Sequence, residues 1–513
     1  MKPHRQAHIP LLRLRSFGLL ACAALAACAT PDGPTPQPLP AAYPAAPSEA
    51  AARPPDWNAL FADPHLRDAL GQSRKGFVNG RGALVAGLPE FEQLRDQARD
   101  VKNHVLAHLD HYLERFEARV TAAGGQVHWA ADAEDARQII LGICRRVGAR
   151  TITKGKSMVS EEVGLNEALE AEGYQVIETD LGEYIIQLAG EPPSHIIAPA
   201  IHKTRAQVAE LFEAAHGGPR KTTVGELVTE ARLVLRDKYF KADVGITGGN
   251  YLVAETGSSV IVTNEGNGDL TQTLARVHIV TSGIERIVPS LEDVSLFQRL
   301  LARSGTGQET ETYTTFSTGP RRPGDPDGPD EYHVVLVDNG RSKMLGGKFQ
   351  DMLRCIRCGA CMNHCPVYGA VGGHAYGWVY PGPMGSVLTP LFVGLDSTYD
   401  LPNACTLNGR CQTVCPVRIP LPELLRELRH RQSQAGLRPP AETRALKAWR
   451  FVAERPRLYR AANRLAARAM KAAGGNRGRI ASLPFGEAWS GLRDLPAPEG
   501  RTFLELWQAS KRP

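Results

Sequence analysis

The sequence lacks any apolar run of about 18 residues, the length that a membrane-spanning helix requires. Its apolar share of 42% and charged share of 22% are ordinary for a soluble globular protein. A chain of 513 residues is too long for one ordinary core and predicts about three domains. We therefore expect a soluble protein body of several domains.

Two nucleotide-binding fingerprints are also missing. The stretch Gly155-Lys156-Ser157 ends like a phosphate-binding P-loop, but the position that requires the first glycine holds Arg150. No G-x-G-x-x-G run follows a predicted strand, so this signature of flavin or nicotinamide binding is absent. Nucleotide hydrolysis and dinucleotide-dependent chemistry are therefore disfavoured.

Net positive charge is absent from most of the chain and is confined to its end. Residues 426–513 hold 19 Lys/Arg against 7 Asp/Glu, whereas the whole chain has a net charge of only +6. A basic tail favours an acidic partner, anionic lipid or nucleic acid, and a solvated helical surface is the alternative. No motif of a nucleic-acid-binding fold accompanies the charge, so we expect no nucleic-acid partner. Residues 426–513 are predicted as a basic helical region, with peripheral membrane contact left open.

The middle of the chain, residues 56–345, alternates short β-branched runs with amphipathic stretches. The predicted strands are 126–129, 151–153, 175–178, 195–198, 259–263, 277–280 and 333–337. The predicted helices include 133–147, 161–172, 205–215 and 224–239. This alternation predicts an α/β domain with a mostly parallel sheet covered on both faces.

Three Gly-rich stretches of this domain lie near predicted strand ends, at residues 245–250, 254–258 and 264–268. Open α/β sheets bind ligands at such ends. Tight turns that need a positive φ are the alternative interpretation. The sequence leaves both open.

Cysteine is rare outside one segment, since seven of the ten cysteines lie between Cys355 and Cys415. The run Cys355-x2-Cys358-x2-Cys361-x3-Cys365-Pro366 matches the bacterial ferredoxin pattern. Zinc sites use cysteine pairs at longer separation. Residues 346–425 are therefore predicted as an α-helical, ferredoxin-type iron-sulfur domain, and the protein is expected to move electrons.

The second run, Cys405-x5-Cys411-x3-Cys415-Pro416, lacks one thiol. Aligned with the first run, it has Asn408 where the first has Cys358. Crossed ligation assigns one cluster to Cys355, Cys358, Cys361 and Cys415, and the other to Cys365, Cys405 and Cys411. We predict a 4Fe-4S first cluster, and a second that is either 3Fe-4S or 4Fe-4S with a non-cysteine ligand.

Two further residues have side chains that can ligate metals. His374, in the Gly-rich and aromatic stretch between the two runs, could ligate iron, although packing over the clusters is the alternative. Cys144 lies in a predicted helix and is expected to be a buried apolar residue.

The N-terminus, residues 1–55, looks like an export signal followed by a Pro- and Ala-rich spacer. Basic residues precede an apolar stretch, and Leu25-Ala26-Ala27-Cys28 resembles a lipobox that would place a lipid on Cys28. Iron-sulfur clusters are normally built in the cytoplasm, and no twin-arginine pair precedes the apolar stretch. We therefore expect a cytoplasmic protein, leave membrane association open, and keep lipoprotein export as the alternative.

From about Trp57 onward the chain resembles the lactate utilization protein B family. The resemblance is carried by the ferredoxin run, the sequence 416–421 after the second run, and the stretches 155–158, 255–258 and 263–268. It implies an α/β fold similar to the sugar-isomerase and CoA-transferase-like superfamily. It also implies an iron-sulfur subunit that passes on electrons from L-lactate as L-lactate is oxidised to pyruvate. The implied partners are a Cys-rich subunit similar to heterodisulfide reductase and a smaller subunit that shares the α/β domain.

Two rival functions remain at this point. One is a self-contained oxidoreductase that binds a small organic acid at the Gly-rich turns. The other is a non-redox protein whose clusters brace a nucleic-acid-binding tail. The resemblance assigns no catalytic residue to this chain, so its status as an enzyme stays open.

Overall fold

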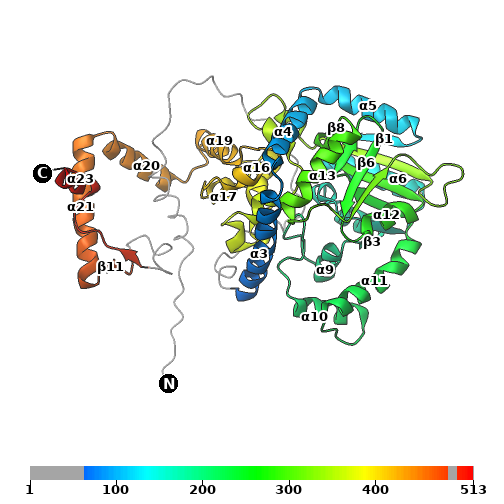
Figure 1. Ribbon diagram of the computed structural model, residues 1–513, viewed down its shortest axis with the longest axis horizontal. Helices are drawn as coiled ribbons and strands as arrows, with labels where there is room; N and C mark the ends of the chain where they lie inside the picture. Colours follow the sequence, from blue (N-terminus) through cyan, green and yellow to red (C-terminus); the bar gives the residue numbers. More distant parts are fainter. Residues whose placement is uncertain (1–62, 483–493, 512–513) are drawn as a thin grey trace. The chain divides into compact units, whose positions relative to one another are not determined.

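The computed structural model describes residues 63–482 and 494–511. Described residues up to Arg431 form one compact unit, and those from Gln432 onward form another (Figure 1). The signal-like segment with Cys28 lies outside the described residues. Within residues 63–482 and 494–511, no helix has the length and apolar character needed to cross a bilayer.

A six-stranded parallel sheet forms the centre of the first unit, with strand order β1-β10-β7-β4-β2-β3. Its strands are β1 (Gln126–Ala130), β2 (Thr151–Lys154), β3 (Gln175–Glu178), β4 (Val244–Gly248), β7 (Val277–Gly283) and β10 (Glu331–Val337). The predicted α/β architecture is confirmed. From β2 the chain continues to β3, which lies on one side of β2 in the sheet. The later strands β4, β7 and β10 are added on the other side of β2. The strand order therefore reverses between β2 and β4.

A smaller sheet has the order β8-β5-β6-β9. Its strands are β5 (Tyr251–Val253), β6 (Ser258–Thr263), β8 (Ile287–Val288) and β9 (Tyr313–Ser317). The predicted strand 259–263 therefore exists, but it pairs antiparallel with β5 and β9 outside the parallel sheet. The predicted strand 195–198 is wrong, because His195 Nδ1 accepts the N–H groups of Ile197 and Ala198 and holds the backbone in a turn.

The Gly-rich stretch 245–250 contains the end of a strand as well as a turn. Residues 244–248 form β4, which the sequence interpretation missed. A Cβ atom on Gly245 would lie 1.9 Å from the carbonyl oxygen of Thr271 in α12 (Asn267–Leu274). Glycine is needed here so that the helix can lie directly on the strand, and no positive φ is involved.

Helices cover both faces of the parallel sheet. This part of the chain contains the helices α3 (Pro64–Ala86), α4 (Phe91–Ala107), α5 (Leu109–Ala122), α6 (Ala133–Arg146), α7 (Met158–Glu162), α8 (Leu165–Ala171), α9 (Leu181–Ala189), α10 (Arg205–His216), α11 (Val224–Lys241), α12 and α13 (Leu291–Gly305), not all of which pack directly on the sheet. The predicted helix 161–172 is interrupted at Gly164, whose φ of 64° ends α7 before α8 begins. The local sequence determines where several of these helices begin. Thr223 and Glu226, for example, form a capping box at the start of α11.

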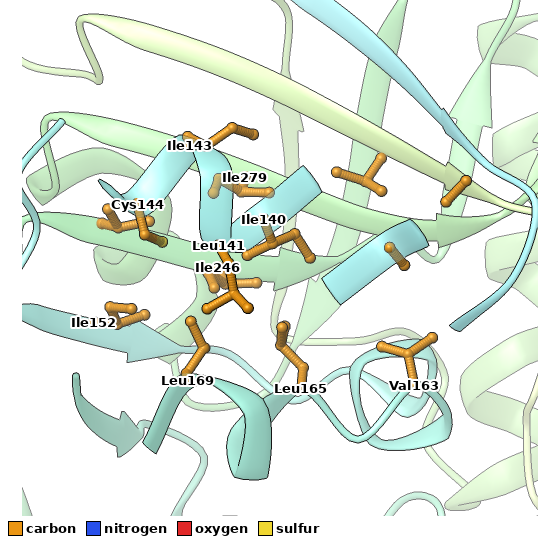
Figure 2. Packing of buried hydrophobic residues seen from close by; sticks show 14 of the residues in the cluster. Ile140, Leu141, Ile143, Cys144, Ile152, Val163, Leu165, Leu169, Ile246 and Ile279 are labelled. Carbon is orange, nitrogen blue, oxygen red and sulfur yellow. The ribbon is translucent and has the colours of Figure 1, made fainter. Parts of the chain in front are cut away.

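The core on one face is built by a helical stripe on α6. Ala136, Ile140, Ile143 and Cys144 recur at helical spacing and are buried. Figure 2 shows Ile140, Ile143 and Cys144 of this stripe with Ile246 of β4 and Ile279 of β7, and with Leu165 and Leu169 from α8 below. Cys144 is thus a buried apolar residue, as expected. The opposite face packs against α4 and α5 through alternate residues of β10.

Further helices and loops follow the α/β part, and their residues up to Arg431 belong to the same unit. They are the 3-10 segments η4 (Ser342–Met344), η5 (Gln350–Arg354) and η6 (His374–Tyr376), and the helices α14 (Ala360–Asn363), α15 (Tyr368–Val371), α16 (Gly382–Val393), α17 (Asp400–Asn403), α18 (Arg410–Val414) and α19 (Leu421–Gln434). The predicted boundaries at residues 345 and 425 stay predictions, because the α/β part and these helices pack into one compact unit.

The second unit is mainly helical. It contains α20 (Pro440–Ala453), α21 (Pro456–Gly474), α23 (Phe503–Ser510), the 3-10 segment η7 (Gly475–Arg477) and a two-stranded ribbon of β11 (Arg479–Ile480) and β12 (Leu495–Pro496). This agrees with the predicted helical C-terminal region.

The packing of α12 on β4 can be tested with Gly245→Ala. We expect this change to lower the free energy of unfolding by about 1–3 kcal/mol or more, because the added methyl group overlaps the Thr271 carbonyl. Gly142→Ala is the matched control, since that exposed α6 position has no neighbour within 4 Å. The control should be neutral or stabilising by about 0.5–1 kcal/mol. Urea unfolding under anaerobic conditions measures both, and equal stability of the two variants contradicts the packing argument.

Candidate iron-sulfur centres

The first cysteine loop is wound tightly around its sulfur atoms. Arg357 and Gly359 both have left-handed backbone, with φ of 59° and 71°. This turn lets the N–H of Arg357 donate to Cys355 Sγ over 3.4 Å. Left-handed backbone at a non-glycine residue costs about 1–2 kcal/mol and persists only where the surroundings impose it.

Four thiols, which we call the first thiol group, line one small and mostly apolar cavity. They are Cys355, Cys358, Cys361 and Cys415. Cys415 comes from the second run, about 50 residues further along the chain. The N–H of Ile419 donates to Cys415 Sγ over 3.4 Å. The structure thus brings together the four residues that the crossed pattern assigns to one cluster.

The other three cysteines form the second thiol group, Cys365, Cys405 and Cys411. After burial, the nearby Cys405 and Cys365 thiols are the main causes that raise the pKa of Cys411, to about 12. The N–H of Leu407 donates to Cys405 Sγ, and that of Tyr368 to Cys365 Sγ. Cys361 interacts electrostatically with Cys411, so the two thiol groups are neighbours.

The second loop repeats the backbone of the first with an offset of 50 residues. Leu407 and Gly409 have φ of 54° and 80°, matching Arg357 and Gly359. Asn408 therefore occupies the place of Cys358 in three dimensions as well as in the alignment. Its Oδ1 accepts the N–H of Arg410 over 2.9 Å, and the side chain is exposed.

Buried guanidinium groups surround the first thiol group. Arg81 of α3 and Arg95 of α4 donate to the backbone carbonyls of Val414 and Cys415, with Arg95 Nη2 at 2.7 Å from the Cys415 oxygen. Arg286 lies 3.5 Å from the carbonyl oxygen of Cys355. Arg81, Arg95 and Arg286 are each less than 9% exposed. Sequence reasoning missed all three, because each lies at least 69 positions from its carbonyl partner.

A buried ion network lies behind this site. Arg341 makes two hydrogen bonds to Glu162, at 2.8 and 2.7 Å, and a 2.7 Å ion pair with Glu285 that lacks hydrogen-bond geometry. Glu285 also pairs with Arg357 of the first cysteine loop at 3.5 Å. Burial alone raises the pKa of Glu285, but Arg341, Arg357 and then Arg286 outweigh it and hold the pKa at about 2. Tyr380 donates to Glu162 over 2.5 Å.

The residues present fit iron-sulfur clusters. Burial raises the pKa of Cys415 to about 11 and that of Cys358 further, so these thiols stay protonated without a cation. A bound metal removes such protons, and the anionic cluster that results is matched by the buried guanidinium groups. Clusters bound here would supply one-electron redox centres. The ligand assignments themselves remain predictions.

His374 lies in η6 and makes other contacts. Its Nε2 binds the carbonyl oxygen of Pro192 at 2.8 Å, and its ring packs on His202. Glu191, His202 and His374 place their ligand atoms within 4.8 Å of one another. Glu191 is already bound to His202 and Lys203.

Two of the Gly-rich stretches line one cavity of about 280 Å³. Residues 247–250 and 263–268 contribute to it, whereas residues 254–258 do not. Gly155, Lys156 and Ser157, which fail the P-loop pattern, form part of the same wall. Cys358 of the first thiol group completes the wall.

Comparisons with protein families match three stretches of the chain. Residues 113–337 match the LUD domain, residues 351–419 the 4Fe-4S dicluster domain, and residues 426–512 the C-terminal domain of lactate utilisation protein B.

Several relatives are similar over most of their length. Lactate utilization protein B of Bacillus licheniformis is 44% identical over 452 residues, which cover 87% of this chain and 94% of that protein. Its counterpart in Lysinibacillus sphaericus is 45% identical over 443 residues, or 85% and 92% of the two chains. The uncharacterized electron transport protein YkgF of Escherichia coli is 44% identical over 445 residues, or 86% and 93%. A crystal structure of a DUF162 family protein from Deinococcus radiodurans aligns with a TM-score of only 0.26 and 15% identity, covering 45% of this chain and 98% of that one.

The ligand role of the first thiol group can be tested with Cys361→Ala. We expect anaerobically purified wild-type protein to be brown, with iron and sulfide in similar amounts, and the variant to lose roughly half of both. Cys144→Ala is the control, because it also removes a thiol but from a buried position in the α6 core. Metal analysis and visible absorption measure the outcome. Zinc without visible absorption, or equal iron loss in both variants, contradicts the assignment.

Proposed function

Because the chain belongs to the lactate utilization protein B family, we propose that it is the electron-transfer subunit of a complex that oxidises L-lactate to pyruvate. The coarser role, an iron-sulfur protein of lactate utilization, follows from the family and from the dicluster domain. The observation that carries the finer role is the pair of neighbouring thiol groups in one compact unit. Two adjacent one-electron centres provide a route for electrons through the protein.

Oxidation of L-lactate to pyruvate releases two electrons and two protons. Two clusters that each accept one electron could hold both electrons in turn. The chain has no flavin or nicotinamide fingerprint of the G-x-G-x-x-G type. We therefore propose that it works with two companion subunits, one Cys-rich and similar to heterodisulfide reductase, and one smaller with the same α/β domain. Electrons would leave this complex toward the respiratory chain.

A reducing compartment suits the seven thiols of the cluster domain, all of which are free. We place the protein in the cytoplasm on this basis. The second unit carries exposed Leu465, Phe503 and Trp507 together with the basic residues of the tail. Apolar side chains beside positive charge support a peripheral contact with an anionic membrane surface.

The role can be tested by deleting the gene in a host that has no second L-lactate dehydrogenase. We expect growth on L-lactate to be lost and growth on pyruvate to be kept, because only the oxidation step is removed. A gene copy carrying Cys361→Ala should fail to restore growth, whereas one carrying Cys144→Ala should restore it. Normal L-lactate oxidation by the deletion strain contradicts the proposed role.

The second centre is proposed to be a 3Fe-4S cluster, or a 4Fe-4S cluster with one iron that lacks a thiolate. Asn408 stands at the missing position and offers only a neutral amide, which is a poor ligand for iron beside thiolates. The structure also shows its Oδ1 bound to the N–H of Arg410.

This assignment predicts a specific effect of Asn408→Cys. The variant should gain a fourth thiolate, so that its electron paramagnetic resonance spectrum changes to that of two conventional 4Fe-4S centres. Asn403→Cys, on an exposed position of α17, is a control for the mere addition of a thiol. Indistinguishable spectra of wild type and Asn408→Cys, both showing two conventional 4Fe-4S centres, would falsify the special status of this position.

A further inference from the structure

The cavity of about 280 Å³ lies at the carboxyl ends of the parallel strands. The segments after β2 (155–157) and after β4 (249–250) form two of its walls. The strand order reverses between these two neighbouring strands. In open α/β sheets, ligands bind in the crevice at such a reversal. The place in the fold is therefore one where a ligand is expected.

Lys156 and Arg286 are positively charged side chains that line this cavity, and of the two Arg286 already has Glu285 nearby. Lys156 Nζ is shielded from solvent and has no hydrogen-bond partner among the described residues. Arg286 is 8% exposed, and its hydrogen bond to the Cys355 carbonyl is a long one of 3.5 Å. An unpaired buried cation is costly, so Lys156 in particular favours an anion in the cavity.

The lining also contains three acidic residues, Asp180, Glu265 and Glu311. Burial, and then the nearby Asp180, raise the pKa of Glu265 to about 7. Burial also raises the pKa of Glu311, whose Oε1 has no partner in the described structure. Arg357 is already paired with Glu285. Asp180 Oδ1 accepts the N–H groups of Gly182 and Glu183. No acidic side chain of the lining forms a hydrogen bond with Lys156 Nζ in the described structure.

The N-terminus of α12 adds donors to the same wall. Asn267 and Gly268 begin this eight-residue helix and line the cavity. Its N-cap is Gly266, so no side chain caps the first turn. A Cβ on Gly268 would lie 2.6 Å from Ile261 Cδ1. Because glycine has no Cβ, the start of α12 can lie this close to the small sheet. Free N–H groups at a helix start favour a negative ligand.

The redox site forms another part of the wall. Cys358 lines the cavity, and a Cβ on Gly305, at the end of α13, would lie 2.5 Å from the Cys358 carbonyl oxygen. Asn363 of α14 donates to the Gly305 carbonyl over 2.8 Å. The end of α13 thus packs closely on the first cysteine loop, and both segments line the cavity.

We propose that this cavity binds the carboxylate of a small organic acid, held by Lys156 and Arg286 next to the first thiol group. The volume lies just below the roughly 300–1,000 Å³ typical of sites for drug-sized ligands, so it suits a metabolite. The proposal rests on the proposed function only for the choice of probes, L-lactate and pyruvate. It assigns the chain a substrate or product site in addition to its clusters.

The test is calorimetric titration of the full-length, anaerobically purified protein with L-lactate, pyruvate and inorganic phosphate. We expect saturable binding of at least one of the two organic acids. Lys156→Met should weaken it by about 10- to 100-fold, because one charge-assisted hydrogen bond is lost. Lys156→Arg should keep most of the affinity. Lys241→Met is the matched control, since Lys241 is a highly exposed lysine on α11.

A second measurement does not depend on a variant. Addition of the bound acid should change the electron paramagnetic resonance spectrum of the reduced first centre, because Cys358 lines the cavity. Absence of saturable binding for both acids, binding of phosphate alone, or unchanged affinity in Lys156→Met overturns the proposal. Because no companion subunit is present, binding without electron transfer from L-lactate leaves this proposal standing and counts only against the proposed function.

Discussion

The ion network around Glu285 is the constraint on which the rest of the first unit depends. Glu285 follows β7, Arg341 follows β10, and Arg357 belongs to the first cysteine loop. A buried carboxylate is unfavourable unless cations surround it, so these segments must come together for the fold to form. Lys102 of α4 also donates to the Glu285 carbonyl. Glu285 thus binds the segment after β10 and the cluster loop through its carboxylate, and an N-terminal helix through its backbone carbonyl.

The same arrangement explains why the cluster loops are embedded in the α/β part. Arginines from α3 and α4 and from the end of β7 reach the loop carbonyls and leave positive charge around the first thiol group. Such charge favours an anionic cluster, and hydrogen bonds and net charge near a cluster also set its reduction potential. The second thiol group has one thiol fewer and an exposed Asn408, so the two centres have different surroundings.

The cavity at the strand ends is lined by both the α/β part and the first cysteine loop. Its walls come from the Gly-rich segments of the sheet and from Cys358. A carboxylate held there would lie beside the first thiol group. This cavity is therefore relevant to both functions considered, the self-contained oxidoreductase and the electron-transfer subunit. The two functions differ in which protein first accepts the electrons of the organic acid.

The sequence by itself determined the features that depend on near neighbours. The Cys355 to Cys365 spacing is local, so the ferredoxin-type loop and the position of Asn408 could be predicted from it. The periodicity of α6 likewise predicted a buried Cys144. The family also follows from sequence, since the two lactate utilization proteins B compared above are 44% and 45% identical over most of the chain.

Tertiary structure decided what joins residues far apart. The sequence interpretation took Gly245 for part of a turn, because nothing local shows that Thr271 packs on it. The incomplete P-loop pattern gave Lys156 no role, and no pattern links Lys156 to Arg286 or to Cys358. Buried charges such as Arg81, Arg95 and Glu285 find partners only when the chain folds, since electrostatic and packing energies depend on distance in space and not on separation along the sequence.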